Sequence, residues 1–97
     1  MPRSFREIYP EKDPEGFEAM MKLRSFACQD GALPPKTKTL LAIFADLILG
    51  HPGGAKAILK ANANLGITQD EIKELVRMAA LFGGMPVFVM GAELLED

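Results

Sequence analysis

A chain of 97 residues can form one domain with a single modest core, and 48% hydrophobic with 25% charged residues is a globular composition. A net charge of −2 with scattered lysines and arginines excludes a nucleic-acid surface and an anionic-membrane surface. The only cysteine, Cys28, leaves no intrachain disulfide, so we expect a reducing, cytoplasmic location.

The N-terminal part of the chain predicts one irregular segment followed by a helix. Residues 1–12, which end in Pro10 and a charged pair, are expected to be irregular. Asp13 followed by Pro14 is typical of a helix start, because aspartate caps the first turn and proline needs no N–H there. Apolar residues then recur at spacings of three and four, and we expect this helix to begin the single folded domain, residues 13–97.

The remaining sequence predicts four more helices, each bounded by proline, glycine or a capping residue. The periodicity places them over residues 34–49, over residues 52–65, from Thr68 onward, and in a short last segment after a Gly-Gly pair. Thr68 and Glu71 match the S/T-x-x-E capping box. No segment shows the period-two alternation of a half-buried strand. We therefore predict an all-α fold of about five helices.

An uncharged stretch near the C-terminus predicts contact between subunits. Residues 78–92 carry no charge, but glycine and proline interrupt them and they are too short to span a membrane. They are also more apolar all round than a surface helix pair in a small monomer. Either they form the centre of the core or part of them faces another copy. We expect a homo-oligomer, and no nucleic-acid or membrane partner.

Three features in a fixed order carry a resemblance to a known family. They are DGALPPKTK at residues 30–38, the capping-box helix after Gly66, and the turn Gly83-Gly84-x-Pro86. With this spacing, residues 30–96 resemble the carboxymuconolactone decarboxylase and alkylhydroperoxidase-D-like family. The resemblance implies an all-helical fold built around an antiparallel helix pair, and assembly into a homotrimer or homohexamer.

The redox motif of that family is missing here. Its redox members carry C-x-x-C at the start of the third helix, a histidine four residues later, and an upstream glutamate. Aligned through Gly50 and Gly66, the four reactive positions hold other residues: His51, Gly54, Ile58 and Thr39. Cys28 lies on another helix and has no partner in the chain. We expect no thiol-dependent peroxidase activity. The decarboxylase branch also lacks the cysteine pair and remains open, although its members keep the histidine where Ile58 stands.

Asp46 and His51 are the candidate catalytic residues. Asp46 interrupts an apolar run near a helix C-terminus, where the helix dipole disfavours a carboxylate by about 0.3–1 kcal/mol. Thr39 lies two helical turns earlier on the same face, and His51 follows Gly50. A carboxylate that orients an imidazole makes an acid–base pair. Alternatively, Asp46 faces solvent or an ion-pair partner, and His51 is a loop residue without a role.

The segment GHPGGAK suggests anion binding at a helix start. It lacks the spacing of a phosphate-binding loop. Gly53 and Gly54 nevertheless leave first-turn N–H groups uncovered, and Lys56 is close, so a small anion could bind. Thr39 is a further candidate ligand contact. One histidine and one carboxylate fall short of a metal site, so we expect no metal and no cofactor.

Three functions remain open at this stage. The first is binding of a small anionic molecule in an interface pocket, without peroxide reduction. The second is a decarboxylase or lyase that uses His51 with Asp46. The third is a non-catalytic structural or partner-binding oligomer.

Overall fold

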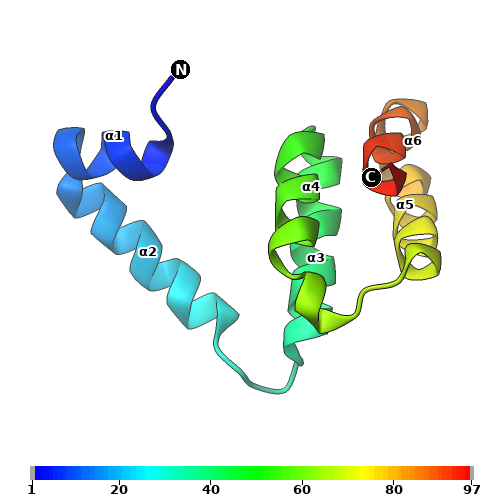
Figure 1. Cartoon of the computed structure of the whole chain (residues 1–97), viewed down its shortest axis with the longest axis horizontal. Helices are drawn as coiled ribbons and strands as arrows, with labels where there is room; N and C mark the ends of the chain where they lie inside the picture. Colours follow the sequence, from blue (N-terminus) through cyan, green and yellow to red (C-terminus); the bar gives the residue numbers. More distant parts are fainter. Residues whose placement is uncertain (1, 97) are drawn as a thin grey trace. The chain divides into compact units, whose positions relative to one another are not determined.

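The computed structural model describes residues 2–96, and these confirm the all-α prediction (Figure 1). Within that range there are six α-helices, two short 3-10 helices and no strand. The elements are α1 (Phe5–Lys12), α2 (Pro14–Cys28), α3 (Pro35–Ile48), α4 (Pro52–Ala61), η1 (Ala63–Leu65), α5 (Gln69–Gly83), α6 (Met85–Gly91) and η2 (Ala92–Leu95). None of the described helices is long and apolar enough to cross a membrane.

The described chain divides between Gly31 and Ala32 into two compact units. The boundary between the two units therefore lies after α2, and the single domain that we expected over residues 13–97 stays a prediction. The first unit holds α1 and α2, which lie against each other in Figure 1. The link between the two helices α2 and α3 contains Gly31 and Pro34, residue types that interrupt a helix, and Pro35 is the first residue of α3.

The N-terminal segment also differs from the sequence expectation, because residues 5–12 form the helix α1 instead of an irregular stretch. Pro10 lies inside this helix. The ring of Phe5 packs against that of Phe17 on α2, with centroids 6.4 Å apart. This contact between helices offsets the local cost of the proline, and local sequence alone does not reveal it.

The second unit is built from α3 to η2. Figure 1 shows α3 and α4 side by side, and α5 beside α6. The turn at Gly50 reverses the chain between α3 and α4, so these two helices form the expected antiparallel pair. α4 ends at Ala61, earlier than predicted, and the predicted residues beyond Asn62 form the 3-10 helix η1. At this end the Asn62 side-chain amide donates to the Ile58 carbonyl at 2.8 Å.

Helix α5 begins as the sequence predicts. The Thr68 hydroxyl accepts from the Glu71 N–H at 3.1 Å, and the Thr68 N–H donates to the Glu71 carboxylate at 2.8 Å. The capping box is therefore complete. Gly84, with a φ of 78°, then separates α5 from α6 in the left-handed region that glycine adopts without strain.

The hydrophobic core lies within the second unit. Its buried side chains come from every α-helix of that unit: Ile43, Leu47, Ala55, Ile72, Val76, Ala79, Val87 and Leu94. Helix α6 crosses α5 at very short range, because an added Cβ at Gly91 would lie 2.6 Å from the Val76 Cγ1. The core thus positions α3, α4 and α5, the helices that carry the candidate sites.

Candidate functional site

The turn that ends α3 places His51 directly beside Asp46. Gly50 has a φ of 84°, and its N–H donates to the Leu47 carbonyl at 3.1 Å. The His51 N–H donates to the Asp46 carbonyl at 2.8 Å. These two bonds and the left-handed glycine form a Schellman motif, which fixes the path of the chain as it leaves the helix. A backbone hydrogen bond therefore ties together the two residues that the sequence paired.

The Asp46 side chain lies against the first turn of α4. An ideal Cβ at Gly54 would be 2.7 Å from the Asp46 Oδ2 and 3.7 Å from the His51 Cβ. Any side chain at position 54 would therefore meet the Asp46 carboxylate, and glycine leaves the space for it. Asp46 is half-buried and His51 is exposed. Asp46, His51 and Gly54 form a cluster at the start of α4, which we call the α4 cluster.

The side chains of the α4 cluster are close without being joined. Within residues 2–96 the carboxylate of Asp46 and the imidazole of His51 make no hydrogen bond or ion pair. His51 occupies the N-cap position of α4 but its side chain does not cap the helix. The first turn of α4 therefore keeps N–H groups that side chains do not satisfy, and the nearby acid and imidazole are available to a ligand.

The other predicted ligand residues lie at different distances from the α4 cluster. An added Cβ at Gly53 would meet nothing within 4 Å, so the backbone there is open, in contrast to Gly54. Lys56 lies half-buried two residues further along α4. Thr39 is two turns before Asp46 on α3, about 10 Å along the helix axis, and is not part of the cluster. Ile58 packs against the core, so the family's histidine position is used for packing here.

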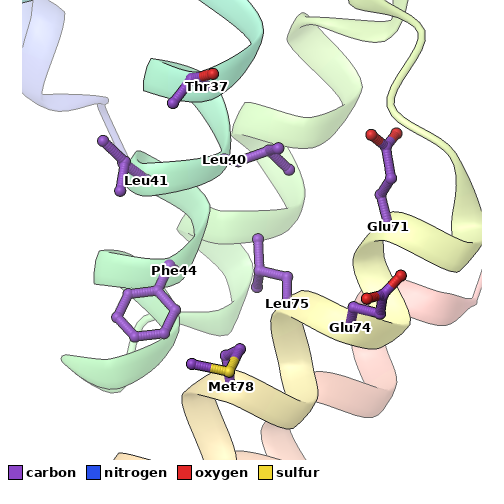
Figure 2. A pocket seen from close by; sticks show the side chains of 8 residues that line it. All are labelled: Thr37, Leu40, Leu41, Phe44, Glu71, Glu74, Leu75 and Met78. Carbon is purple, nitrogen blue, oxygen red and sulfur yellow. The ribbon is translucent and has the colours of Figure 1, made fainter. Parts of the chain in front are cut away.

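A second feature, which the sequence did not reveal, is an apolar groove between α3 and α5 (Figure 2). It has a volume of about 430 Å³. Figure 2 shows Leu40 and Leu75 across from each other, Phe44 and Met78 at one end, and two carboxylates along α5. The lining residues are Thr37, Leu40, Leu41, Phe44, Glu71, Glu74, Leu75 and Met78. None of the six predicted site residues is among them, so this groove and the α4 cluster are separate sites.

The acidic side of the groove has one engaged and one free carboxylate. Besides its capping bond, Glu71 accepts from the Lys36 ammonium at 2.9 Å. The Thr68 N–H and then the Lys36 ammonium hold the pKa of the Glu71 carboxyl below its ordinary value of 4.5. Glu74 makes no ion pair with any described residue. The groove therefore combines an apolar floor with negative charge along one edge.

Metal binding has no support from the arrangement of side chains. Among residues 2–96 no three histidine, cysteine, aspartate or glutamate side chains come close enough together to hold an ion. The chemistry available at the α4 cluster is therefore that of one carboxylate, one imidazole, a nearby ammonium and open backbone N–H groups.

Comparisons with known proteins point to a single family. The model of the carboxymuconolactone decarboxylase family matches residues 14–97. The 4-carboxymuconolactone decarboxylase of Acinetobacter baylyi is 34% identical over 65 residues, which are 67% of this chain and 48% of that protein. An uncharacterized protein of Methanocaldococcus jannaschii is 30% identical over 91 residues, which are 93% of this chain and 88% of that protein. No solved structure matches.

Proposed function

Because the chain belongs to the carboxymuconolactone decarboxylase family, we propose that it handles a small anionic molecule at the α4 cluster, without thiol-dependent peroxide reduction. The matched decarboxylase is named for a carboxylated lactone, although this chain spans only about half the length of that relative. A carboxylated ligand fits the open first turn of α4, where backbone N–H groups and the helix dipole favour negative charge.

One observation carries the proposal, namely the different surroundings of the two glycines at the start of α4. Gly53 faces open space, so a ligand carboxylate can approach its N–H, and Lys56 follows three residues later on the same helix. Gly54 faces the Asp46 carboxylate instead. A bound carboxylate would thus lie on the Gly53 side, while Asp46 and His51 face the rest of the ligand.

The closeness of Asp46 and His51 favours a second candidate, a decarboxylase or lyase that uses them as an acid–base pair. Both lie within 4 Å of the Cβ position of Gly54, and the Schellman motif fixes their separation. In this candidate the imidazole transfers a proton to or from the substrate and the carboxylate orients the imidazole. If the protein neither binds an anion nor catalyses a reaction at the α4 cluster, its role is that of a non-catalytic structural or partner-binding oligomer.

Self-association is part of the proposal, and with it the idea that a neighbouring copy completes the ligand pocket. Large apolar side chains are exposed on α5 and α6, including Leu81, Phe82 and Met85. A surface of this kind marks a contact with another protein, and the symmetric homo-oligomers common among soluble proteins supply one. We also place the protein in the cytoplasm, because its lone cysteine forms no intrachain disulfide.

Calorimetric titration with 4-carboxymuconolactone tests the binding step, with the dimethyl ester of the same lactone as the neutral control. Lys56→Gln is expected to weaken binding, because it removes the only basic side chain in the first two turns of α4. Asp46→Asn is expected to tighten binding by about fivefold, since it removes a like charge worth about 1 kcal/mol at 4–5 Å. Asp70→Asn is the matched control, an exposed aspartate on the first turn of α5. Equal affinity for acid and ester would refute the anion site.

Release of carbon dioxide from the same lactone separates the two candidates. If the protein is a decarboxylase, Asp46→Asn and His51→Ala each lower kcat at least about tenfold, and Asp46→Asn does so while binding tightens. Opposite effects of one substitution on binding and on turnover would not arise from misfolding. Binding without any release of carbon dioxide would leave the ligand-handling function and exclude the decarboxylase.

A further inference from the structure

We propose that the pocket between α1 and α2 binds a small free quaternary ammonium ion, a cation whose nitrogen carries only alkyl groups. This pocket consists of residues of the first unit, so it is separate from the α4 cluster. The model of the family matches residues 14–97, and the part of the pocket that α1 supplies lies outside that match. The family match therefore assigns no ligand to it.

The pocket lies between two helices that follow each other directly in the chain (Figure 1). Its volume is about 310 Å³. Sites for small molecules usually have volumes of about 300–1,000 Å³. The lining consists of three aromatic rings, two methionine side chains, one carboxylate and one glycine. The pocket is therefore large enough for a small ligand and is mostly apolar.

The three aromatic rings meet at the pocket because of their positions on the two helices. Phe5 and Tyr9 are four residues apart on α1 and share one face of that helix. Phe17 lies opposite on α2, and its ring is tilted by 52° from that of Phe5, with centroids 6.4 Å apart. Rings at this angle are not stacked face to face, so their faces remain accessible to another group. Ring faces within about 6 Å attract a cation, and sites for quaternary ammonium groups use such aromatic walls.

Asp13 supplies a negative charge at the wall of the pocket. Its Oδ1 accepts from the Gly16 N–H at 3.0 Å, a bond that caps α2. An added Cβ at Gly16 would overlap the Asp13 Oδ2, so the glycine leaves the space that the carboxylate occupies. The Oδ2 makes no hydrogen bond or ion pair with a described residue. The cap therefore holds the carboxylate in place while one of its oxygens stays available to a cation.

The basic side chains that precede Asp13 do not pair with it. Arg3 and Lys12 both pair with Glu11. The Arg6 guanidinium lies over an aromatic ring of the same helix, 5.0 Å from the ring centroid. None of these three cations lines the pocket. Among the described lining residues Asp13 is the only charged one, so the pocket carries one uncompensated negative charge and suits a monovalent cation.

The small number of acceptors in the pocket favours a quaternary over a primary ammonium ion. The side-chain oxygens in the lining are the carboxylate of Asp13 and the hydroxyl of Tyr9. A primary ammonium has three N–H donors, and burying donors without acceptors is unfavourable. A quaternary ammonium has no N–H donor, and its alkyl groups pack against ring faces and against the polarizable thioethers of Met20 and Met21.

The test uses the full chain with choline as the probe. The neutral control is 3,3-dimethylbutan-1-ol, which has the same shape but carbon in place of the nitrogen. Tyr9 is the only tyrosine and the chain has no tryptophan, so intrinsic fluorescence reports directly on the pocket. At constant ionic strength choline is expected to change this fluorescence with saturation and to bind at least about tenfold more tightly than the neutral control. Ethanolamine, a primary ammonium, is expected to bind more weakly than choline.

Two variants test the charge and the rings separately. Asp13→Asn is expected to weaken choline binding about fivefold and to leave binding of the neutral alcohol unchanged, because asparagine keeps the helix cap without the charge. Tyr9→Leu is expected to weaken choline binding about two- to fivefold, measured by NMR of the choline methyl protons because the fluorophore is lost. The matched controls are Glu15→Gln and Phe26→Leu, an acid and an exposed ring of α2 that do not line the pocket. Circular dichroism checks that helix content is unchanged.

Three results would overturn the inference. Equal affinity for choline and for the neutral alcohol would mean that the pocket does not recognise positive charge. Tighter binding of ethanolamine than of choline would assign the attraction to the carboxylate alone. Sedimentation of the protein with phosphatidylcholine vesicles, without binding of free choline, would assign the site to a lipid headgroup. All variants lie in the first unit, so none of these results bears on the ligand titrations at the α4 cluster.

Discussion

Replacing Gly91 with alanine is expected to destabilise the protein, because α6 passes α5 with no room for a side chain at this position. The added methyl would lie 2.6 Å from the Val76 Cγ1, 3.1 Å from its Cγ2 and 3.4 Å from its Cβ. Favourable carbon–carbon contacts need about 3.5–4.0 Å. Val76 is buried and β-branched on a helix, so its side chain has essentially one rotamer and does not turn away.

The size of the effect follows from two opposing contributions. Overpacking a well-filled core costs about 1–3 kcal/mol, and alanine regains up to about 1 kcal/mol of helix propensity over glycine. We therefore expect Gly91→Ala to lower the free energy of unfolding by about 1–2 kcal/mol. For a chain of this length each kcal/mol lowers Tm by about 4–8 °C. Circular dichroism during thermal and urea unfolding, at one fixed protein concentration, measures both quantities.

A double-mutant cycle separates the contribution of the contact between position 91 and Val76 from other effects on stability. Val76→Ala alone is expected to cost about 2 kcal/mol, since it removes two buried methyl groups and leaves a cavity. In the double variant the methyl added at position 91 occupies part of that cavity, so the two costs are less than additive by at least about 1 kcal/mol. Gly53→Ala is the matched control, because an added Cβ there meets nothing within 4 Å. Full additivity, or a Gly91→Ala variant as stable as the original chain, would refute the close approach.

Three further predictions concern the thiol positions and the pH dependence of stability. The pure protein is expected to show no thiol-dependent hydroperoxide reduction, and turnover that survives Cys28→Ser would contradict our assignment of the site. The variant His51→Cys/Gly54→Cys in an Asp46→Ala background is expected to form a disulfide, because the Cβ separation of 3.7 Å suits one, and thiol titration measures it. Since capping and ion pairing lower the pKa of the Glu71 carboxyl, its stabilisation is complete above the ordinary value of 4.5 and is lost as the pH falls through the lowered pKa. The urea unfolding midpoints of Glu71→Gln and of the original chain should therefore differ at pH 7 and converge in acid. A difference between the two midpoints that does not change with pH would contradict the contribution of the Glu71 carboxylate.

Helix boundaries that depend on short sequence signals were predictable. The capping box at Thr68 and the glycine after α3 act through neighbouring backbone groups, so their sequence pattern is sufficient to identify them. Helix α1 was not predictable in this way, because its support comes from the Phe5–Phe17 contact and its own sequence contains a proline. The early end of α4, where the chain changes to the 3-10 helix η1, was not predictable either, because helical periodicity does not distinguish the two kinds of helix over three residues.

The candidate sites also include one part that local sequence predicts and one part that depends on how the helices pack. The spacing of Asp46 and His51 across a terminating glycine was enough to expect them together, since a helix C-cap has a fixed geometry. Thr39 lies on the same face of α3 as Asp46, but two helical turns earlier along the helix. The α3–α5 groove could not be predicted, because it depends on how far apart two packed helices lie. Leu41 and Met78 are exposed although they are large apolar residues on amphipathic helices, because helical periodicity shows which residues share a face but not what covers that face.

The carboxylate next to Gly54 also bears on which residues position 54 accepts. With Asp46 in place, an added Cβ at position 54 would lie 2.7 Å from the Oδ2, so the carboxylate would have to turn aside, whereas a small apolar residue at position 46 would remove that requirement. The effect of a substitution at position 54 therefore depends on the residue at position 46, and paired substitutions at the two positions are expected to deviate from additivity.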